Sequence, residues 1–363
     1  MKKVFALVLA LCMVFALCAC GKTAAPAATE AAAPAEAAPA EAAPAEAAAP
    51  AEEAAPATYK LGMGVNVSTD STAESNAQVD ATVAAVVVDA NGVIVACAID
   101  CAQNKMDVSE GTVDTAKEFK SKTELGFDYN MVKFSGCTYE WFEQAAAFAQ
   151  YCIGKTGADI AGMETVVNEE GHQVTTDETL YATCSISIGA FIDAVVKACN
   201  DEWAVEFSAD SFKLGVACNS TAAESTEATD DEAGSCNMYT EFGAAVVGED
   251  GKILACVNDA IQPKIAYTKD GTVGDVTFKG TKRELGDNYN MVAYGNAIAE
   301  WDAQSAAFSN YCVGKTADEV LAIDTVVNEE GHNVATDETL LASCTMSITG
   351  MGAVIAKAAN NAK

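Results

Sequence analysis

Two segments of the chain combine an acidic residue, a small residue and a hydroxyl residue at the same spacing. The first reads Asp-Glu-Thr-Leu-Tyr-Ala-Thr over 177–183, and the second reads Asp-Glu-Thr-Leu-Leu-Ala-Ser over 337–343. An exposed hydroxyl can accept a phosphoryl group if small neighbours admit the donor, and the start of a helix close behind it helps to hold phosphate. Alternatively, such hydroxyls cap the backbone where a helix begins. The spacing therefore indicates either a phosphoryl acceptor or a local cap.

These segments resemble the flavin-attachment signature of the FMN-binding domain family, Asp-x-x-Ser/Thr-Gly-Ala-Thr/Ser. In that family a flavin transferase esterifies the hydroxyl with FMN taken from FAD. The resemblance implies that Asp177 and Asp337 are the acids and that Ala182 and Ala342 are the small residues. It also implies that Thr183 and Ser343 carry covalent FMN. Leucine and a second bulky residue stand where the family has Ser/Thr-Gly.

Two lysines at equivalent positions are further candidates for cofactor binding. Lys122 and Lys282 each lie shortly before Glu-Leu-Gly. The chain has a net charge of −31, of which residues 1–57 carry −3, so −28 belongs to residues 58–363. A cation kept twice in so acidic a chain is a candidate for binding a phosphate or carboxylate. The alternative is an ion pair with a neighbouring acid.

Other motifs are typical of turns and caps. Gly-Lys-Thr at 154–156 resembles the end of a phosphate loop, but position 149 is Ala where such a loop needs Gly. Thr-Ala-Asp-Glu at 316–319 is a capping box, which predicts that these segments separate two helices. His172 and His332 each follow Asn-Glu-Glu-Gly, which favours a hairpin turn over a metal ligand.

Most of the chain is an internal duplication of one sequence. The block Thr-Val-Val-Asn-Glu-Glu-Gly-His at 165–172 returns unchanged at 325–332, and Trp141 returns as Trp301. Both recur 160 positions later. Copies of roughly 150 residues have the size of domains and not of solenoid repeats. We expect repeat domains at 58–208 and 209–363.

The residue patterns in each copy predict strands, then a helix, then a hairpin, then a helix. Apolar, β-branched runs at 82–88 and 93–99 flank Asp-Ala-Asn-Gly, a strong hairpin signal. Apolar residues at helical spacing predict amphipathic helices over 141–152 and from about residue 188. This order indicates an α+β fold, a mainly antiparallel sheet with packed helices.

The N-terminus predicts export and lipidation. Two lysines precede an apolar run over 4–17, which is too short to span a bilayer and is typical of a secretory signal. Leu-Cys-Ala-Cys at 17–20 resembles the bacterial lipobox, in which the cysteine, here Cys20, is lipidated, for example with palmitate. Alternatives are an ordinary cleaved signal or an uncleaved anchor. Residues 21–57 are rich in Ala, Pro and Glu and predict an extended tether.

Composition excludes several classes of partner. With 52 acidic and 21 basic residues, nucleic acid is not an expected partner. Two histidines and no CxxC pair argue against His-rich metal sites and a dithiol redox centre. Eleven of the 14 cysteines lie beyond residue 20, several on apolar faces, and we expect most of them to be small buried hydrophobes.

Together these features favour a lipid-anchored protein on the outer face of the cell membrane. Tandem copies on a tethered lipid anchor resemble surface flavoproteins that pass electrons outside Gram-positive cells. We therefore expect a carrier of covalent FMN, served by a flavin transferase and by redox partners, more than a turnover enzyme. The alternative is a non-catalytic surface lipoprotein that binds a ligand or partner, or a structural lipoprotein of the cell envelope.

Overall fold

A computed structural model describes residues 56–363, and Cys20 and the signal region lie outside the described residues. Contacts gather Ala54–Lys363 into one compact unit. The first repeat has this element order: β1 (Ala57–Ser68), β2 (Asn76–Val88), β3 (Ile94–Asp107), α1 (Lys122–Leu125), η1 (Gly126–Tyr129), α2 (Met131–Ser135), α3 (Trp141–Cys152), α4 (Gly157–Ala161), β4 (Thr165–Val167), β5 (Gln173–Thr175), α5 (Glu178–Tyr181), α6 (Gly189–Cys199) and β6 (Val205–Ala209).

The second repeat has the same helices in the same order, which confirms the duplication, but its strands are divided differently and no strand after α12 corresponds to β6. Its elements are β7 (Lys213–Thr221), β8 (Gly234–Asn237), β9 (Tyr239–Val247), β10 (Ile253–Ile261), β11 (Lys264–Tyr267), β12 (Val273–Thr277), α7 (Lys282–Leu285), η2 (Gly286–Tyr289), α8 (Met291–Gly295), α9 (Trp301–Cys312), α10 (Ala317–Leu321), β13 (Thr325–Val327), β14 (Asn333–Ala335), α11 (Glu338–Leu341) and α12 (Thr349–Asn360). Strands β8, β11 and β12 form a small sheet of their own, in the order β12-β11-β8.

Each repeat contributes one antiparallel sheet. The strand order is β3-β2-β1-β6 in the first sheet and β10-β9-β7 in the second. The predicted turn between β2 and β3 is present: the carboxylate of Asp89 accepts hydrogen bonds from the backbone N–H of Asn91 and of Val93. Gly92 has φ +76°, a conformation that favours glycine. The α+β prediction is confirmed, with strands longer than the apolar runs that predicted them.

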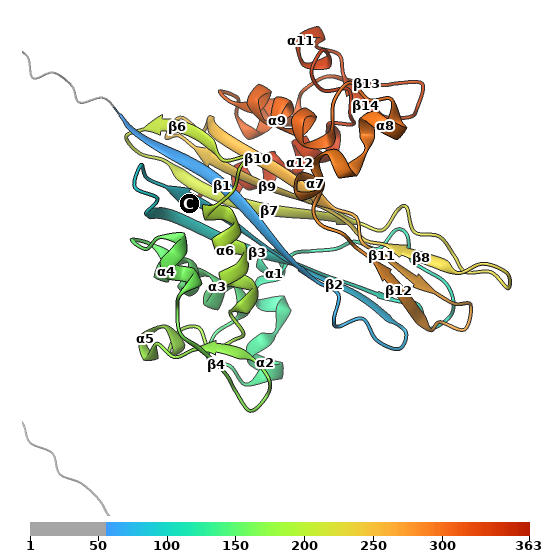
Figure 1. Ribbon diagram of the computed structural model, residues 1–363, viewed down its shortest axis with the longest axis horizontal. Coiled ribbons are helices and arrows are strands. Elements are labelled where there is room, and N and C mark those ends of the chain that lie inside the picture. Colours follow the sequence, from blue (N-terminus) through green and yellow to red (C-terminus); the bar gives the residue numbers. More distant parts are fainter. Residues whose placement is uncertain (1–55) are drawn as a thin grey trace, which may run out of the picture. The chain divides into compact units, whose positions relative to one another are not determined.

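The two sheets pack face to face, and the helices cover their outer faces. Strand β2 shows why, because its side chains alternate between two cores. Ala81 and Val83 lie in the core that both sheets share, whereas Ala84 and Val86 contact the helices of the first repeat. A third core joins the second sheet to its own helices. Figure 1 shows the resulting four layers, with α3 and α6 on one side of the strands and α9 and α12 on the other.

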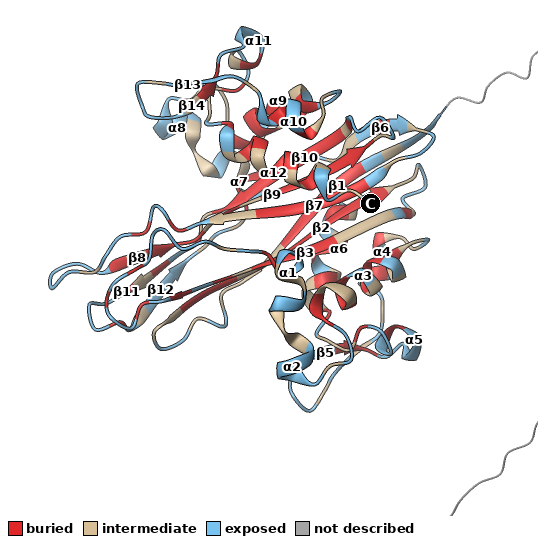
Figure 2. Cartoon of the chain, turned by 180° about the vertical axis from the view of Figure 1, so that it is seen from behind, coloured by how far each residue is buried: buried red, intermediate tan, exposed pale blue. Residues whose placement is uncertain are grey.

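Helix α6 lies against β1, and α12 lies against β7, where glycine allows close approach. A Cβ on Gly62 would clash with the carbonyl oxygen of Ala198, and one on Gly215 would clash with that of Ala358. Figure 2 shows the buried strands at the centre and the mostly exposed α2, α5 and α11 at the periphery. None of the helices within 56–363 is long and apolar enough to cross a bilayer.

Candidate functional site

The first acid–hydroxyl segment forms one turn of helix and a reverse bend. Asp177 caps α5, where its carboxylate accepts hydrogen bonds from the backbone N–H of Thr179 and Leu180 at 2.9 and 3.0 Å. Just past the helix, the Thr183 hydroxyl donates to the carbonyl of Leu180 at 3.2 Å. Both Ala182 and Thr183 are exposed. The hydroxyl is therefore held at the surface with a small neighbour.

The second segment repeats this geometry. Asp337 caps α11, and the Ser343 hydroxyl donates to the carbonyl of Leu340 at 3.2 Å. Ala342 and Ser343 are exposed. The hydroxyl of Tyr311 also donates to Asp337 at 3.1 Å. The hydrogen bonds from the α11 backbone lower the pKa of Asp337, so this carboxylate stays ionised as a cap.

Each segment is attached to the first turn of the preceding long helix. The side-chain carbonyl of Gln144 in α3 accepts a hydrogen bond from the backbone N–H of Ser185 at 2.9 Å, and Gln304 in α9 does the same for Thr345 at 2.8 Å. Both glutamines are buried. Helices α6 and α12 begin only at Gly189 and Thr349. The hydroxyls of Thr183 and Ser343 therefore do not cap these helices.

Lys122 lies beside aromatic rings near this first turn of α3. Its Nζ is 5.2 Å from the ring centres of both Tyr129 and Trp141, a cation–π arrangement. Burial lowers the pKa of Lys122, but the neighbouring Cys101, Tyr129 and Asp80 raise it, and the net direction is upward. Lys122 therefore remains protonated at neutral pH.

Lys282 is held more tightly. It is 8% exposed, and its Nζ lies 4.7, 4.9 and 5.4 Å from the ring centres of Tyr239, Tyr289 and Trp301. Burial raises the pKa of Glu241 to about 7, although the charge of Lys282 opposes this rise. Within the described residues, neither lysine has an ion pair, and no hydrogen bond joins either one to the acid–hydroxyl segments. What connects each lysine to the segment of its own repeat is the first turn of the long helix: Lys122 and Lys282 contact the tryptophan that begins α3 or α9, and the glutamine three residues later bonds to the backbone just after the segment.

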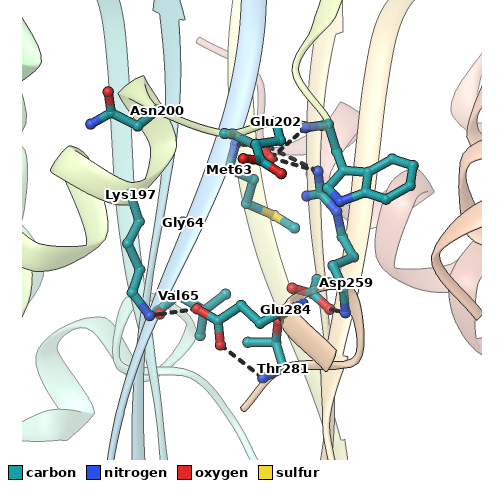
Figure 3. A pocket seen from close by; sticks show the side chains of 12 residues that line it. Met63, Gly64, Val65, Lys197, Asn200, Glu202, Asp259, Thr281 and Glu284 are labelled. Carbon is teal, nitrogen blue, oxygen red and sulfur yellow. Dashed lines mark hydrogen bonds and ion pairs between the residues drawn. The ribbon is translucent and has the colours of Figure 1, made fainter. Parts of the chain in front are cut away.

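The repeats meet at a buried ion pair that the sequence did not reveal. Arg283 donates to both carboxylate oxygens of Asp201 at 2.7 and 3.0 Å, and each side chain is 7% exposed. The guanidinium lies 6.0 Å from the ring centre of Trp203. Met63 also donates its backbone N–H to Asp201 at 3.0 Å. Arg283, Asp201 and Trp203 line a cavity of about 320 Å³. Figure 3 shows the side chains that line this cavity, among them the labelled Met63 and Asp259.

Two further ion pairs join the repeats, and they occupy equivalent positions, as an approximate twofold symmetry requires. Lys197 of α6 contacts Glu284 at 2.6 Å, and Lys357 of α12 contacts Glu124 at 2.6 Å. Each lysine also donates to a backbone carbonyl of the first strand of its own repeat. All four residues obey the 160-residue offset, so the offset marks the two ion pairs as equivalent, although it does not show which residues are in contact.

The motifs interpreted as turns are turns. Thr156 and Thr316 cap α4 and α10 with complete capping boxes, and Gly154 and Gly314 have φ of +81° and +83°. The two histidine segments close the β4–β5 and β13–β14 hairpins. No group of three or more potential metal ligands occurs among residues 56–363.

The eleven described cysteines are free thiols, and eight of them are buried. Burial raises the pKa of Cys184 to about 12 and that of Cys344 to about 11. Their thiolate forms are therefore rare at neutral pH, and they pack as small apolar side chains.

No family model matches the sequence, and it matches neither the curated proteins nor the solved structures with which it was compared. The two repeats therefore serve as the comparison for each other. A feature built twice is a shared property of the domain, and a difference between equivalent positions shows where one repeat has specialised.

Proposed function

We propose that the chain is an exported lipoprotein that carries FMN, esterified through its phosphate to Thr183 and Ser343, and that it transfers electrons at the cell surface. One observation carries the proposal. In both repeats an exposed hydroxyl follows an aspartate-capped helical turn and lies next to an exposed alanine. The resemblance to the FMN-binding signature supplies the chemistry.

Attachment requires an accessible oxygen nucleophile. The hydroxyl oxygen bonds to the phosphorus atom of the FMN half of FAD, the bond to the AMP half breaks, and AMP leaves. The hydroxyl proton passes to a base of the flavin transferase. Among residues 56–363, the side-chain hydroxyls of Thr183 and Ser343 bond only to the backbone carbonyl three residues earlier, so rotation of the side chain frees each hydroxyl for this step.

The remaining residues of the proposed site hold the acceptor in place. Asp177 and Asp337 bond to their own helical turns and act as positioning residues. Lys122 and Lys282 supply positive charge near the first turns of α3 and α9, where the phosphate of the flavin would be attracted. Bound flavin would supply the redox chemistry, and the protein would position it.

The proposal is tested by intact-mass measurement of the chain co-expressed with a flavin transferase. We expect two additions of an FMN phosphoester, one lost in Thr183→Ala, the other in Ser343→Ala, and both in the double variant. Matched controls are Ser187→Ala and Ser347→Ala, which remove exposed hydroxyls four residues further on and should keep both additions. An unchanged mass and a colourless protein would refute the proposal and favour non-catalytic binding.

A further inference from the structure

The cavity of about 320 Å³ between the repeats has an excess of negative charge. Six charged side chains line it: Lys197, Asp201, Glu202, Asp259, Arg283 and Glu284. Two of them are cations and four are carboxylates, so the lining has a formal charge of −2. Both cations are already used in ion pairs, Lys197 with Glu284 and Arg283 with Asp201. Among residues 56–363, the carboxylates of Glu202 and Asp259 therefore have no cation within ion-pair distance.

Asp259 of β10 is the buried one of these two carboxylates. It is 5% exposed, and it accepts hydrogen bonds from the backbone N–H of Ala260 and of Arg283 at 2.7 and 3.1 Å. Burial raises the pKa of Asp259 to about 6, although the charge of Arg283 and these hydrogen bonds oppose the rise. The carboxylate is thus mostly ionised at neutral pH, and a cation that enters the cavity stabilises its charge.

Glu202 and Trp203 are the exposed part of the lining. Both follow the end of α6, and Trp203 is 39% exposed. An aromatic ring attracts an ammonium group that lies within about 6 Å of the ring centre. Met63 and Val65 of β1 also line the cavity. The lining therefore combines a buried carboxylate, an exposed carboxylate, an aromatic ring and apolar residues.

The equivalent cavity in the other half of the molecule lacks this combination. It has a volume of about 410 Å³ and lies beside β3 and α3. Its aspartate is Asp100, which accepts the backbone N–H of Thr123 as Asp259 accepts that of Arg283. By the 160-residue offset, Lys363 takes the place of Trp203. Asp100 and Lys363 are the two charged side chains among the residues that line this cavity, so their charges cancel.

We infer that the cavity between the repeats binds an aliphatic diamine, a small organic molecule with two ammonium groups. One ammonium group contacts Asp259, and the other contacts Glu202 beside the ring of Trp203. The two positive charges of the ligand match the charge of −2 on the lining, and the charge of −28 on residues 58–363 attracts cations to the protein.

The size and composition of the cavity agree with this ligand. A volume of about 320 Å³ is near the lower limit of ligand pockets, which is about 300 Å³, so the ligand must be small. No group of three or more potential metal ligands occurs among residues 56–363, so the lining suits an organic cation better than a metal ion. The inference does not depend on flavin attachment, because the acid–hydroxyl segments lie outside this cavity.

Calorimetric titration with 1,4-diaminobutane tests the inference on the chain produced without residues 1–20. We expect saturable binding of one molecule per chain, because one of the two equivalent cavities has the excess negative charge. The diamine should also reduce the quenching of tryptophan fluorescence by acrylamide, since Trp203 is 39% exposed, whereas Trp141 and Trp301 are 3 and 4% exposed. Butan-1-amine, which has a single ammonium group, should bind at least about tenfold more weakly.

Two variants and a matched control locate the bound diamine. Glu202→Gln and Asp259→Asn each remove one charge at nearly constant size, and each should weaken binding by about tenfold or more. Asp210→Asn removes an exposed carboxylate outside the cavity and should leave the affinity unchanged. Because Glu202 is exposed, its variant reports on binding even if Asp259→Asn fails to fold.

A last control separates the cavity from the general negative charge of the surface. Replacement of Na⁺ by Mg²⁺ at equal ionic strength should not displace the diamine. The inference would be overturned by an absence of saturable binding, by equal losses of affinity in Glu202→Gln and Asp210→Asn, by equal affinity for butan-1-amine, or by displacement with Mg²⁺.

Discussion

Replacement of Arg283 by methionine removes the guanidinium from the buried ion pair between the repeats. Asp201 would keep two hydrogen bonds, from the backbone N–H groups of Met63 and Trp203, but its charge would lose the one cation within ion-pair distance among residues 56–363. Both partners are 7% exposed, so solvent cannot replace the lost contact. Breaking a buried pair in this way costs about 3–5 kcal/mol of the free energy of unfolding.

The positions equivalent to this ion pair carry uncharged residues. By the 160-residue offset, Thr123 corresponds to Arg283, and Asn361 corresponds to Asp201. The double variant Arg283→Thr with Asp201→Asn places these two neutral residues at the positions of the ion pair and leaves no unpaired charge. We expect the free energy of unfolding of the double variant to lie within about 1 kcal/mol of that of the unchanged chain, and to be well above that of either single variant.

Urea unfolding at neutral pH, followed by tryptophan fluorescence, measures these differences. Lys60→Met is the matched control, since Lys60 pairs with Glu206 at the surface, where the side chains are 55 and 65% exposed. Such a pair contributes about 1 kcal/mol or less. The reasoning would be refuted if Arg283→Met cost no more than Lys60→Met, or if the double variant were as unstable as the single one.

Three further predictions concern other parts of the molecule. The pKa of Glu241 is raised from 4.5 to about 7 in the folded chain, so the folded state holds this proton more tightly and stability falls as pH rises from about 4.5 to 7. Glu241→Gln should remove about 3 kcal/mol of that fall, as measured by unfolding at a series of pH values, and an unchanged slope would contradict the assignment. Gly215→Ala should destabilise by about 1–3 kcal/mol in urea because its Cβ meets the carbonyl of Ala358, whereas a neutral effect would show that α12 shifts freely. All eleven thiols should react with maleimide in denaturant without reductant, and a lower count than in the reduced control would reveal disulfides.

Local features of the fold were predictable from the sequence because they depend on nearby residues. The Asp89 turn, the capping boxes at Thr156 and Thr316 and the helix over 141–152 each follow from residue types within a few positions.

Contacts between the repeats were not predictable in this way. Arg283 and Asp201 are 82 positions apart and have no charged counterparts in the other repeat, so neither pattern nor offset marks them. Strand β6 serves the first sheet and also covers β10 of the second, a role that becomes visible only when the sheets are packed. The aromatic surroundings of Lys282 likewise come from three separate elements.

Peptide mapping of the chain co-expressed with a flavin transferase is the most direct test of the proposed function. Cleavage after lysine places Thr183 in the peptide 156–197 and Ser343 in the peptide 316–357. We predict that flavin fluorescence and the FMN mass are confined to these two peptides, with fragmentation locating the phosphoester at Thr183 and Ser343. Flavin on any other residue, or on none, would contradict the proposal.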